Sequence, residues 1–583
     1  MRASLTGSIL VGVGVSLAAL APAQQAGPET TMVPPGRIRQ IKVLADKAPD
    51  CSSLKSIAES VTRDCQSNDE KAIAIYNFMR LTHFNRPYPT EPGGVATLKE
   101  INVYGWSLCG GLHSVQSSLW RELGWDWRFV GWSGHTTVEA KYDDKWHYLD
   151  IFMKFYGWRP DPAAPNGRTI AGEDDLAGDA KALLHDVYVL DSKRNVYYAK
   201  NDRFEMSDGK ANWTAMAFLV QGDSINDIDG GLKTRKTAGR AEGWMNINHA
   251  TGAYSTDINL SPGFRLVQTW ELLDGGWYWG DRKEPPSGTS KDYRNSPQTG
   301  PIMEPYAVPN DRRTTGSGRL VFAPDFGSDV CLKSFAASDN VKCAGGSLVP
   351  VDAAKPASVT VRLQSPYVLC KTTGTADGAD TVEVSIDGGK TYKPADVKDL
   401  TTAVRGQYDA LVRVGFKQAL KALQIEALLQ INKYATPYLS PGKNTITVSV
   451  ADPKDLGDNK VVVTYAYCLG SRDKSYEELC QAGKEVGKAY AATWSSTPTV
   501  VQKVFAAKDL PATFEINVPT PKGKYPVYPK MLYLAREVIG PGSKPMPLPD
   551  GAVEPKMGPD DELKTLPNPF RIGFALPPGP KAK

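Results

Sequence analysis

The chain has 583 residues, a length that at about 150 residues per domain predicts three or four domains. Hydrophobic residues make up 41% and charged residues 23%, a globular balance that excludes a largely disordered chain. The 68 basic and 64 acidic residues leave a net charge of +4, too small for strong attraction to nucleic acid or an anionic membrane.

The first 26 residues have the form of a secretory signal peptide. Arg2 is followed by an apolar run over 9–20, and Ala21-Pro22-Ala23 offers a cleavage site, with Gln24-Gln25-Ala26 as a second choice. The apolar run is short for a membrane span, and an uncleaved N-terminal anchor is the alternative. We therefore expect a secreted or periplasmic protein with no membrane span after cleavage.

Residues 27–205 carry the clearest pattern of helices and strands. Residues 37–84 are predicted to be helical, with Ser67 and Glu70 spaced as a capping box. A second helix is predicted over 109–123, because apolar residues recur on one face and Gly124 follows. Three strands are then expected, over 127–132, 135–142 and 146–153.

The rest of the chain is predicted to be β-rich, so the expected fold class is α+β. Residues 417–431 fit either a helix or a strand. The expected regions are a mixed or β-rich extension and linker over 206–315, a β-sandwich of immunoglobulin-like or jelly-roll-like type over 316–470, a small β-rich region over 471–540 and a proline-rich tail over 541–583.

Eight cysteines fall into three close pairs and two single residues. An exported protein meets oxidising conditions, so each pair is a candidate for a local disulfide, although spacing does not fix connectivity. Cys109 and Cys370 are left over, and these two either bridge each other or leave a free thiol. The close pairs are Cys51/Cys65, Cys331/Cys343 and Cys468/Cys480.

Cys109 stands where the second helix is predicted to begin. The first turn of a helix has unpaired N–H groups and the positive end of the dipole, which favour a thiolate and can stabilise an oxyanion. Gly110 and Gly111 leave the backbone beside the sulfur uncrowded. His113 lies four residues after Cys109, but two ligands without a third make a weak metal site.

His135 and Asp150 are related by the expected hairpin. If Asp143-Asp144 form a two-residue turn, Asp150 lies opposite Thr137 and on the same face as His135. A thiol, an imidazole and a carboxylate in this arrangement supply the nucleophile, the base and the orienting group of acyl transfer. A turn one residue longer or shorter would separate His135 from Asp150.

The order of these motifs resembles the transglutaminase-like superfamily. A helical lead-in, a cysteine opening a helix, Gly-His on one strand and Trp146-x-x-x-Asp150 on the next carry the resemblance, over about residues 37–160. It implies a papain-like, transglutaminase-like domain over residues 27–205, with Cys109 as nucleophile, His135 as general base and Asp150 as the orienting residue. Gly110-Gly111 and Thr136 depart from the family's usual residues. The oxyanion or cleft residue is left open among Tyr104, Trp106 and Gly110, with Asn102 a poorer candidate.

The sequence therefore predicts a cysteine-dependent hydrolase or acyltransferase, either a protease or amidase or a transglutaminase, acting on protein or peptide substrates without a cofactor or metal. The choice between hydrolysis and transamidation stays open. The alternative is a non-catalytic extracellular protein that uses the same scaffold, with β-sandwich modules that contact glycans or a cell surface. No nucleic acid partner is expected.

Overall fold

The computed structural model describes a mixed, β-rich fold. The expected signal peptide lies outside the described residues. The described part of the chain comprises residues 32–85, 88–91, 95–132, 135–151, 155–165, 167–178, 188–189, 197–198, 236–237, 254–283, 315–327, 329–474, 492–566 and 568–571.

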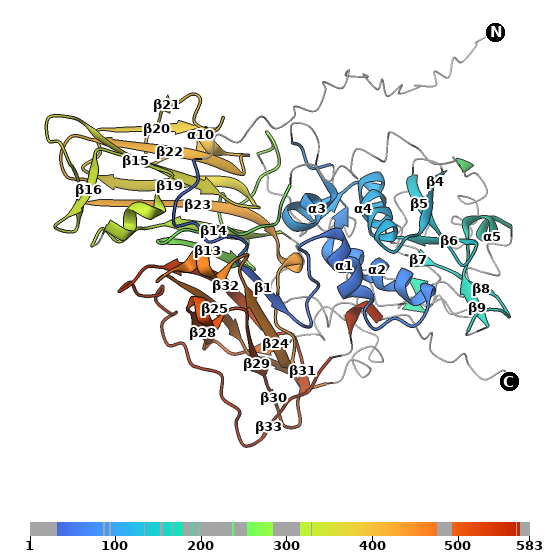
Figure 1. The fold of residues 1–583 in the computed structure, drawn as a ribbon. Coiled ribbons are helices and arrows are strands. Elements are labelled where there is room, and N and C mark those ends of the chain that lie inside the picture. The colour runs from blue at the N-terminus through green and yellow to red at the C-terminus, as the bar shows by residue number, and fades with distance from the viewer. Residues whose placement is uncertain are drawn as a thin grey trace, which may run out of the picture.

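The N-terminal part packs helices against a hairpin sheet (Figure 1). The sheet has the strand order β11-β10-β7-β6-β5-β4-β12. The helices are α1 (Leu54–Thr62), α2 (Asn68–Thr82), α3 (Thr97–Lys99), the π-helix η1 (Glu100–Tyr104), α4 (Cys109–Glu122) and α5 (Glu173–Gly178). The strands are β4 (Asp126–Trp132), β5 (His135–Tyr142), β6 (Lys145–Asp150), β7 (Phe155–Tyr156), β10 (Tyr188–Val189), β11 (Tyr197–Tyr198) and β12 (Lys236–Thr237).

Local signals predicted these elements well, with one correction. The helix at Cys109 and the three strands are confirmed, and Ser67 caps α2 by accepting from the Glu70 N–H at 3.2 Å. The return bond of the box goes from the Gln66 N–H to Glu70. The helical prediction is wrong at its start, because β1 (Lys42–Ala45) is a strand that pairs with β24 (Gly442–Ser449).

A second seven-stranded sheet, which we call the long sheet, has the order β19-β23-β14-β13-β32-β25-β28. It draws strands from the expected extension, sandwich and C-terminal regions, so the boundaries expected at 315 and 470 fall within one continuous sheet. Its strands are β13 (Phe264–Thr269), β14 (Thr315–Phe322), β19 (Val368–Asp377), β23 (Ala422–Asn432), β25 (Lys460–Cys468), β28 (Thr499–Phe505) and β32 (Lys530–Ile539).

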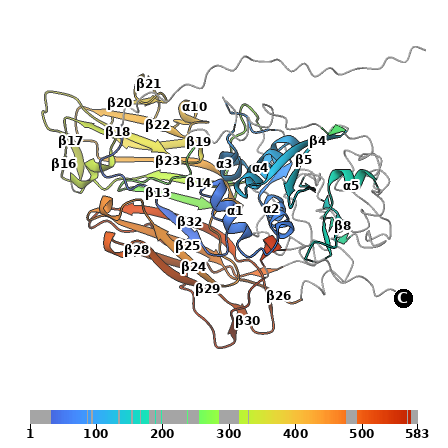
Figure 2. The same ribbon diagram turned by 45° about the vertical axis from the view of Figure 1, so that its right-hand side comes forward.

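Two smaller sheets share the hydrophobic core of the long sheet. The five-stranded sheet has the order β15-β18-β22-β20-β21, and β1-β24-β29 forms the other, as Figure 2 shows from a second side. The remaining strands are β15 (Ala337–Asp339), β18 (Ala357–Gln364), β20 (Thr381–Ser385), β21 (Lys393–Pro394), β22 (Asp409–Phe416) and β29 (Ala512–Val518).

Short strand pairs and helical turns complete the described elements. They are β2 (Phe84–Asn85) with β3 (Trp106–Ser107), β8 (Trp158–Pro160) with β9 (Arg168–Ile170), β16 (Val341–Ala344) with β17 (Ser347–Pro350), β26 (Gly470–Arg472) with β27 (Thr493–Trp494) and β31 (Tyr525–Pro526), β30 (Thr520–Pro521) with β33 (Asp561–Glu562), and the turns α10 (Thr401–Val404), η4 (Asp329–Ser334), η5 (Lys433–Ala435), η6 (Pro453–Leu456), η7 (Ala507–Asp509) and η8 (Pro569–Arg571).

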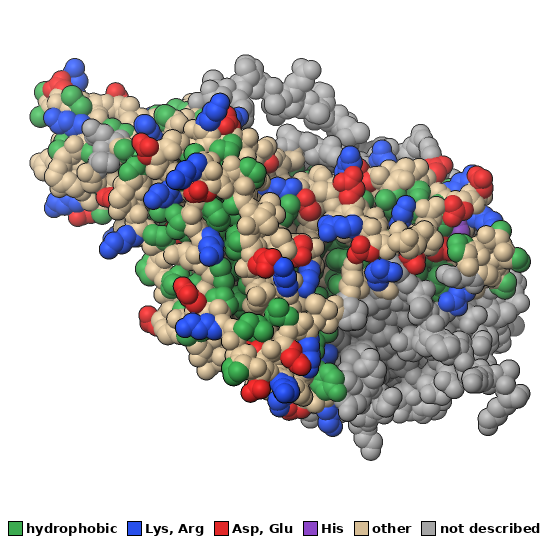
Figure 3. Space-filling view, turned by 60° about the horizontal axis from the view of Figure 1, so that its bottom comes forward, with side chains coloured by type: hydrophobic (Ala, Val, Ile, Leu, Met, Phe, Trp, Pro, Cys, Tyr) green, Lys and Arg blue, Asp and Glu red, His purple; other side chains and the backbone are tan. Residues whose placement is uncertain are grey.

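Part of the expected proline-rich tail returns to the N-terminal helices. The Asn77 side chain in α2 donates to the Phe570 carbonyl at 3.0 Å, and the Phe78 and Phe570 rings lie 6.4 Å apart. The short turn η8 thus lies against α2 (Figure 1). On the face drawn in Figure 3, basic and acidic side chains are interspersed, as the small net charge predicts.

Candidate active site

Helix α4 begins at Cys109, as predicted. Leu108 precedes it with extended backbone, and no side chain at that position caps the helix. The Cys109 side chain is partly exposed, whereas Gly110 is buried. A Cβ at Gly111 would lie 2.0 Å from the Ser107 Oγ, so only glycine fits beneath this serine. The backbone N–H groups in the first turn of α4 therefore lie next to the partly exposed thiol of Cys109.

The hairpin has the turn on which the predicted site depends. Asp143 and Asp144 have φ values of +48° and +58°, and Tyr142 pairs with Lys145. Glu139 pairs with Tyr148, so Thr137 and Glu139 lie on the face of the hairpin that also holds Tyr148 and Asp150. The predicted register is confirmed. The His135 backbone opens β5, and its side chain lies outside the described part of the structure.

Asp150 is fully buried and receives two identified contacts. The Tyr148 hydroxyl donates to Oδ2 at 2.7 Å, and His113 Nε2 lies 3.3 Å from Oδ1. Burial of a carboxylate requires such donors, because the lost hydration is otherwise uncompensated. The carboxyl of β6 is thereby held on the side of the hairpin that faces α4.

His113 connects Cys109 to Asp150. Its Nδ1 lies 2.8 Å from the Cys109 carbonyl oxygen, and a carbonyl only accepts, so Nδ1 carries a proton. Its Nε2 faces Asp150 from the other side of the ring, 3.3 Å from Oδ1. The four-residue spacing from Cys109 was visible in the sequence, but it indicated a weak metal site.

Metal binding finds no support at this histidine. Among the described residues no group of three or more His, Cys, Asp or Glu side chains is arranged to hold a metal ion.

Tyr88 lies at the N-terminus of α4 and was not predicted. Burial raises the pKa of its hydroxyl to about 12, with further contributions from the negative charges that Cys109 and Glu100 carry when ionised. A hydrogen bond from the Gly111 N–H acts in the opposite direction. The residue is still 42% exposed, so this phenol stands at the surface beside the thiol. In the sequence, its position between Pro87 and Pro89 did not indicate that Tyr88 would lie next to Cys109.

Glu100 is a buried acid in the same neighbourhood. It opens the π-helix η1, an element that is often found near functional sites. The side chain is 1% exposed, and its Oε1 has no hydrogen-bond partner in the described part of the chain. Burial raises the pKa of Glu100 to about 8, and the Ser107 side chain opposes that shift. The carboxyl is therefore mainly neutral at pH 7.

Tyr104 and Trp106, two of the predicted oxyanion or cleft residues, are fully buried. The Tyr104 hydroxyl donates to Glu91, which also accepts from Tyr408 and, at 2.6 Å, from Lys99. The Trp106 ring packs against Trp279, with ring centroids 6.2 Å apart. Both residues thus lie where the N-terminal helices meet the β-rich part, and the Tyr104 hydroxyl is already engaged. Gly110, the third candidate, is placed in the first turn of α4.

No disulfide bond joins the described cysteines. The Sγ atoms of Cys331 and Cys343 lie 2.9 Å apart, so this predicted pair is brought together. Burial raises the pKa of Cys65 to about 12 and also raises that of Cys51. Cys480 lies outside the described residues.

Comparisons with known proteins add no relative. No protein-family model, curated protein or solved structure matches the chain. The resemblance to the transglutaminase-like superfamily therefore rests on the motif residues alone. In the described part of the chain, no helix is long and apolar enough to cross a membrane.

Proposed function

We propose that this protein is a secreted or periplasmic thiol-dependent enzyme that acts on amide bonds of protein or peptide substrates, with Cys109, His135 and Asp150 in a papain-like domain. The observation that carries the proposal is the start of α4 at Cys109 beside a hairpin in which Tyr142 pairs with Lys145 and Glu139 with Tyr148, the register that a His135–Asp150 pair requires. The expected lack of a cofactor stays a prediction.

The chemistry follows from the properties of these groups. The Cys109 thiolate attacks the carbonyl carbon of an amide, and the first-turn N–H groups of α4 stabilise the negative oxygen that forms. The C–N bond then breaks as His135 gives a proton to the leaving amine, which leaves a thioester on Cys109. Water hydrolyses the thioester to a carboxylic acid, or an amine attacks it to form a new amide.

Two further groups support a role for the α4 N-terminus. The Tyr88 hydroxyl is a surface donor next to Cys109, and the neutral Glu100 carboxyl adds no charge that would oppose a thiolate below pH 8. Buried Asp150 is the carboxyl that would orient the imidazole of His135 in the proposed triad.

Alkylation of the full-length protein by iodoacetamide across pH tests the proposal. We expect Cys109, identified by mass spectrometry of its peptide, to react at half its maximal rate below about pH 8. Cys65 is the internal control, since it is partly exposed and has a pKa of about 12. His135→Ala should slow Cys109 alkylation about tenfold or more at pH 7. The proposal fails if Cys109 reacts no faster than Cys65, or if His135→Ala leaves its rate unchanged.

A further inference from the structure

A hollow of 340 Å³ lies where the N-terminal segment meets the long sheet. One side is formed by β1 and the loop over 49–52, and another by Asn102 of η1. The opposite wall comes from β13, β32 and the segment around 435–437. The charged and polar side chains that line it include Lys42, Asp50, Asp257, Gln268, Tyr367 and Arg536.

Arg536 is a buried cation that no carboxylate of the described residues balances. It is 3% exposed and lies in β32, opposite Leu266 of β13. Its Nη1 donates to Gln268 Oε1 at 2.6 Å, whereas its buried Nε has no hydrogen-bond partner among the residues that the structure describes. In the described part of the chain no carboxylate forms an ion pair with this guanidinium, and burial lowers its pKa. A buried charge left in this state costs several kcal/mol, on the order of the effects seen when one partner of a buried pair is removed.

The neutral groups beside Arg536 are already oriented. Gln268 Nε2 donates to the Tyr367 hydroxyl at 2.8 Å, which fixes the amide so that its oxygen faces the guanidinium. Both side chains are buried. The amide therefore holds one edge of the guanidinium and leaves its other donors for a ligand.

The acids of the hollow do not balance Arg536. Asp50 is paired with Lys42 at 2.9 Å, and Asp257 accepts from the exposed Gln40 side chain at 3.2 Å. These carboxylates are nearer to solvent, which screens them, whereas Arg536 is buried. They would also repel a ligand with two negative charges.

We propose that this hollow binds a ligand that carries one carboxylate on a small apolar body, with Arg536 as its anchor. A carboxylate matches the planar donors of a guanidinium and neutralises its single charge. Val43, Ala435 and Val450 line the same hollow and suit an apolar body. The shared chemistry covers a free carboxylic acid and the C-terminus of a peptide.

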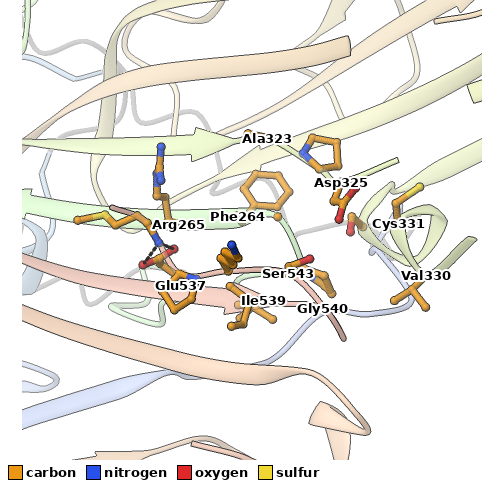
Figure 4. A pocket seen from close by; sticks show the side chains of 18 of the residues that line it. Phe264, Arg265, Ala323, Asp325, Val330, Cys331, Glu537, Ile539, Gly540 and Ser543 are labelled. Carbon is orange, nitrogen blue, oxygen red and sulfur yellow. Dashed lines mark hydrogen bonds between the residues drawn. The ribbon is translucent and has the colours of Figure 1, made fainter. Parts of the chain in front are cut away.

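The other face of the same strands shows the contrast. Arg265 and Glu537 are paired neighbours there and line a larger hollow of 470 Å³ (Figure 4). The Glu537 carboxylate accepts from the Met546 N–H at 3.0 Å, and the charge of Arg265 opposes the rise in the Glu537 pKa that burial causes. A cation and an anion therefore both line that hollow, so it lacks the unbalanced charge that marks Arg536.

Calorimetric titration of the full-length protein tests the proposal. The probes are propionate, N-acetyl-alanyl-alanine, the amide of that dipeptide and inorganic phosphate, all at one ionic strength. We expect at least one of the two carboxylates to bind about tenfold or more tightly than the amide and phosphate, since a charged hydrogen bond is worth 1.5–3 kcal/mol. Propionate binding indicates a free acid as the natural ligand, and binding of the dipeptide alone indicates a peptide C-terminus.

Arg536→Gln should weaken that binding by about tenfold or more. Arg265→Gln is the matched control, because it removes the same charge from the neighbouring strand on the opposite face, and it should leave affinity unchanged. If Arg536→Gln does not fold, the comparison of acid and amide on the unaltered protein decides. The proposal is overturned if neither carboxylate binds, if amide or phosphate binds as tightly as the carboxylate, or if folded Arg536→Gln keeps full affinity. Cys109 alkylation is independent of each of these outcomes.

Discussion

The helix–hairpin region around Cys109 (residues 51–170) and the long sheet around Arg536 both bury charged side chains, but they compensate them differently. In the helix–hairpin region Asp150 has Tyr148 and His113, and buried Glu139 accepts from Arg128 at 2.6 Å. In the long sheet Arg536 has one neutral partner, Gln268. Burial of charge is tolerated when opposite charge or donors are adjacent, so an unbalanced charge points to a ligand rather than to stability.

The two regions meet at Asn432, the last residue of β23. Its side-chain Nδ2 donates to the Thr82 carbonyl at 2.9 Å and to the Ile101 carbonyl at 2.7 Å. The Glu91 cluster with Tyr104, Lys99 and Tyr408 adds a second junction. The two regions are therefore parts of one packed structure.

The largest effect is expected from Gly105→Ala at this junction. Gly105 has φ +68°, and an added Cβ would lie 2.6 Å from Asn432 Nδ2 and 2.8 Å from the Thr82 carbonyl. Backbone strain and overpacking together should lower the free energy of unfolding by about 4 kcal/mol, measured by urea denaturation. Gly124→Ala is the control, since it has φ +76° but nothing within 4 Å, and it should cost about 1 kcal/mol. Equal losses would show that the junction does not constrain Gly105.

The second effect concerns Glu100, a buried acid of the helix–hairpin region. The Glu100 pKa is about 8 in the folded protein against 4.5 for the ordinary carboxyl. Between these two pH values the unfolded chain has released the Glu100 proton that the folded chain retains. The contribution of Glu100 to the free energy of unfolding is therefore greatest below pH 4.5 and falls as pH rises to 8. The slope is about 1.4 kcal/mol per pH unit.

Glu100→Gln should remove this slope. The stability of the variant relative to the unaltered protein should rise by about 2 kcal/mol between pH 6 and pH 8, measured by thermal or urea unfolding at each pH. Glu59→Gln, at an exposed acid on α1, should stay within about 0.5 kcal/mol of the unaltered protein throughout. Parallel pH profiles for Glu100→Gln and the unaltered protein would contradict a buried neutral carboxyl.

The smallest effect is expected from Ser67→Ala, which removes the N-cap of α2. The Glu70 N–H loses its acceptor, so the free energy of unfolding should fall by about 1 kcal/mol. The control is Ser338→Ala at an exposed position of β15, for which we expect less than about 0.5 kcal/mol. A loss at Ser338 that matched the loss at Ser67 would show that the cap contributes nothing specific.

Much of the candidate site could be predicted because its signals are local. The helix start at Cys109 depends on residues within one turn, and the hairpin register depends on the left-handed pair Asp143 and Asp144. Each signal comes from fewer than about 20 neighbouring residues, and the interactions that enforce it are short-range. Whether His135 completes the triad stays a prediction.

The roles of Tyr88, Glu100 and His113 could not be predicted in the same way. Glu100 is charged and follows Lys99, a pattern typical of an exposed helix face, yet packing buries it. His113 was noticed by its spacing, but its partner Asp150 belongs to a strand 37 residues later. Burial and partner identity are properties of the packed molecule, so a local pattern leaves them undetermined.

The sequence alone determined the mixed, β-rich character of the fold, the start of α4 and the turn of the hairpin. The tertiary structure alone decided that residues 42–45 form a strand, because β1 is completed by hydrogen bonds to β24, about 400 residues away. It also resolved the ambiguous run over 417–431, most of which lies in β23 between β14 and β19. The Arg536 hollow has the same origin. Gln268, Tyr367 and Arg536 meet through long-range strand pairing, and no local pattern encodes their contact.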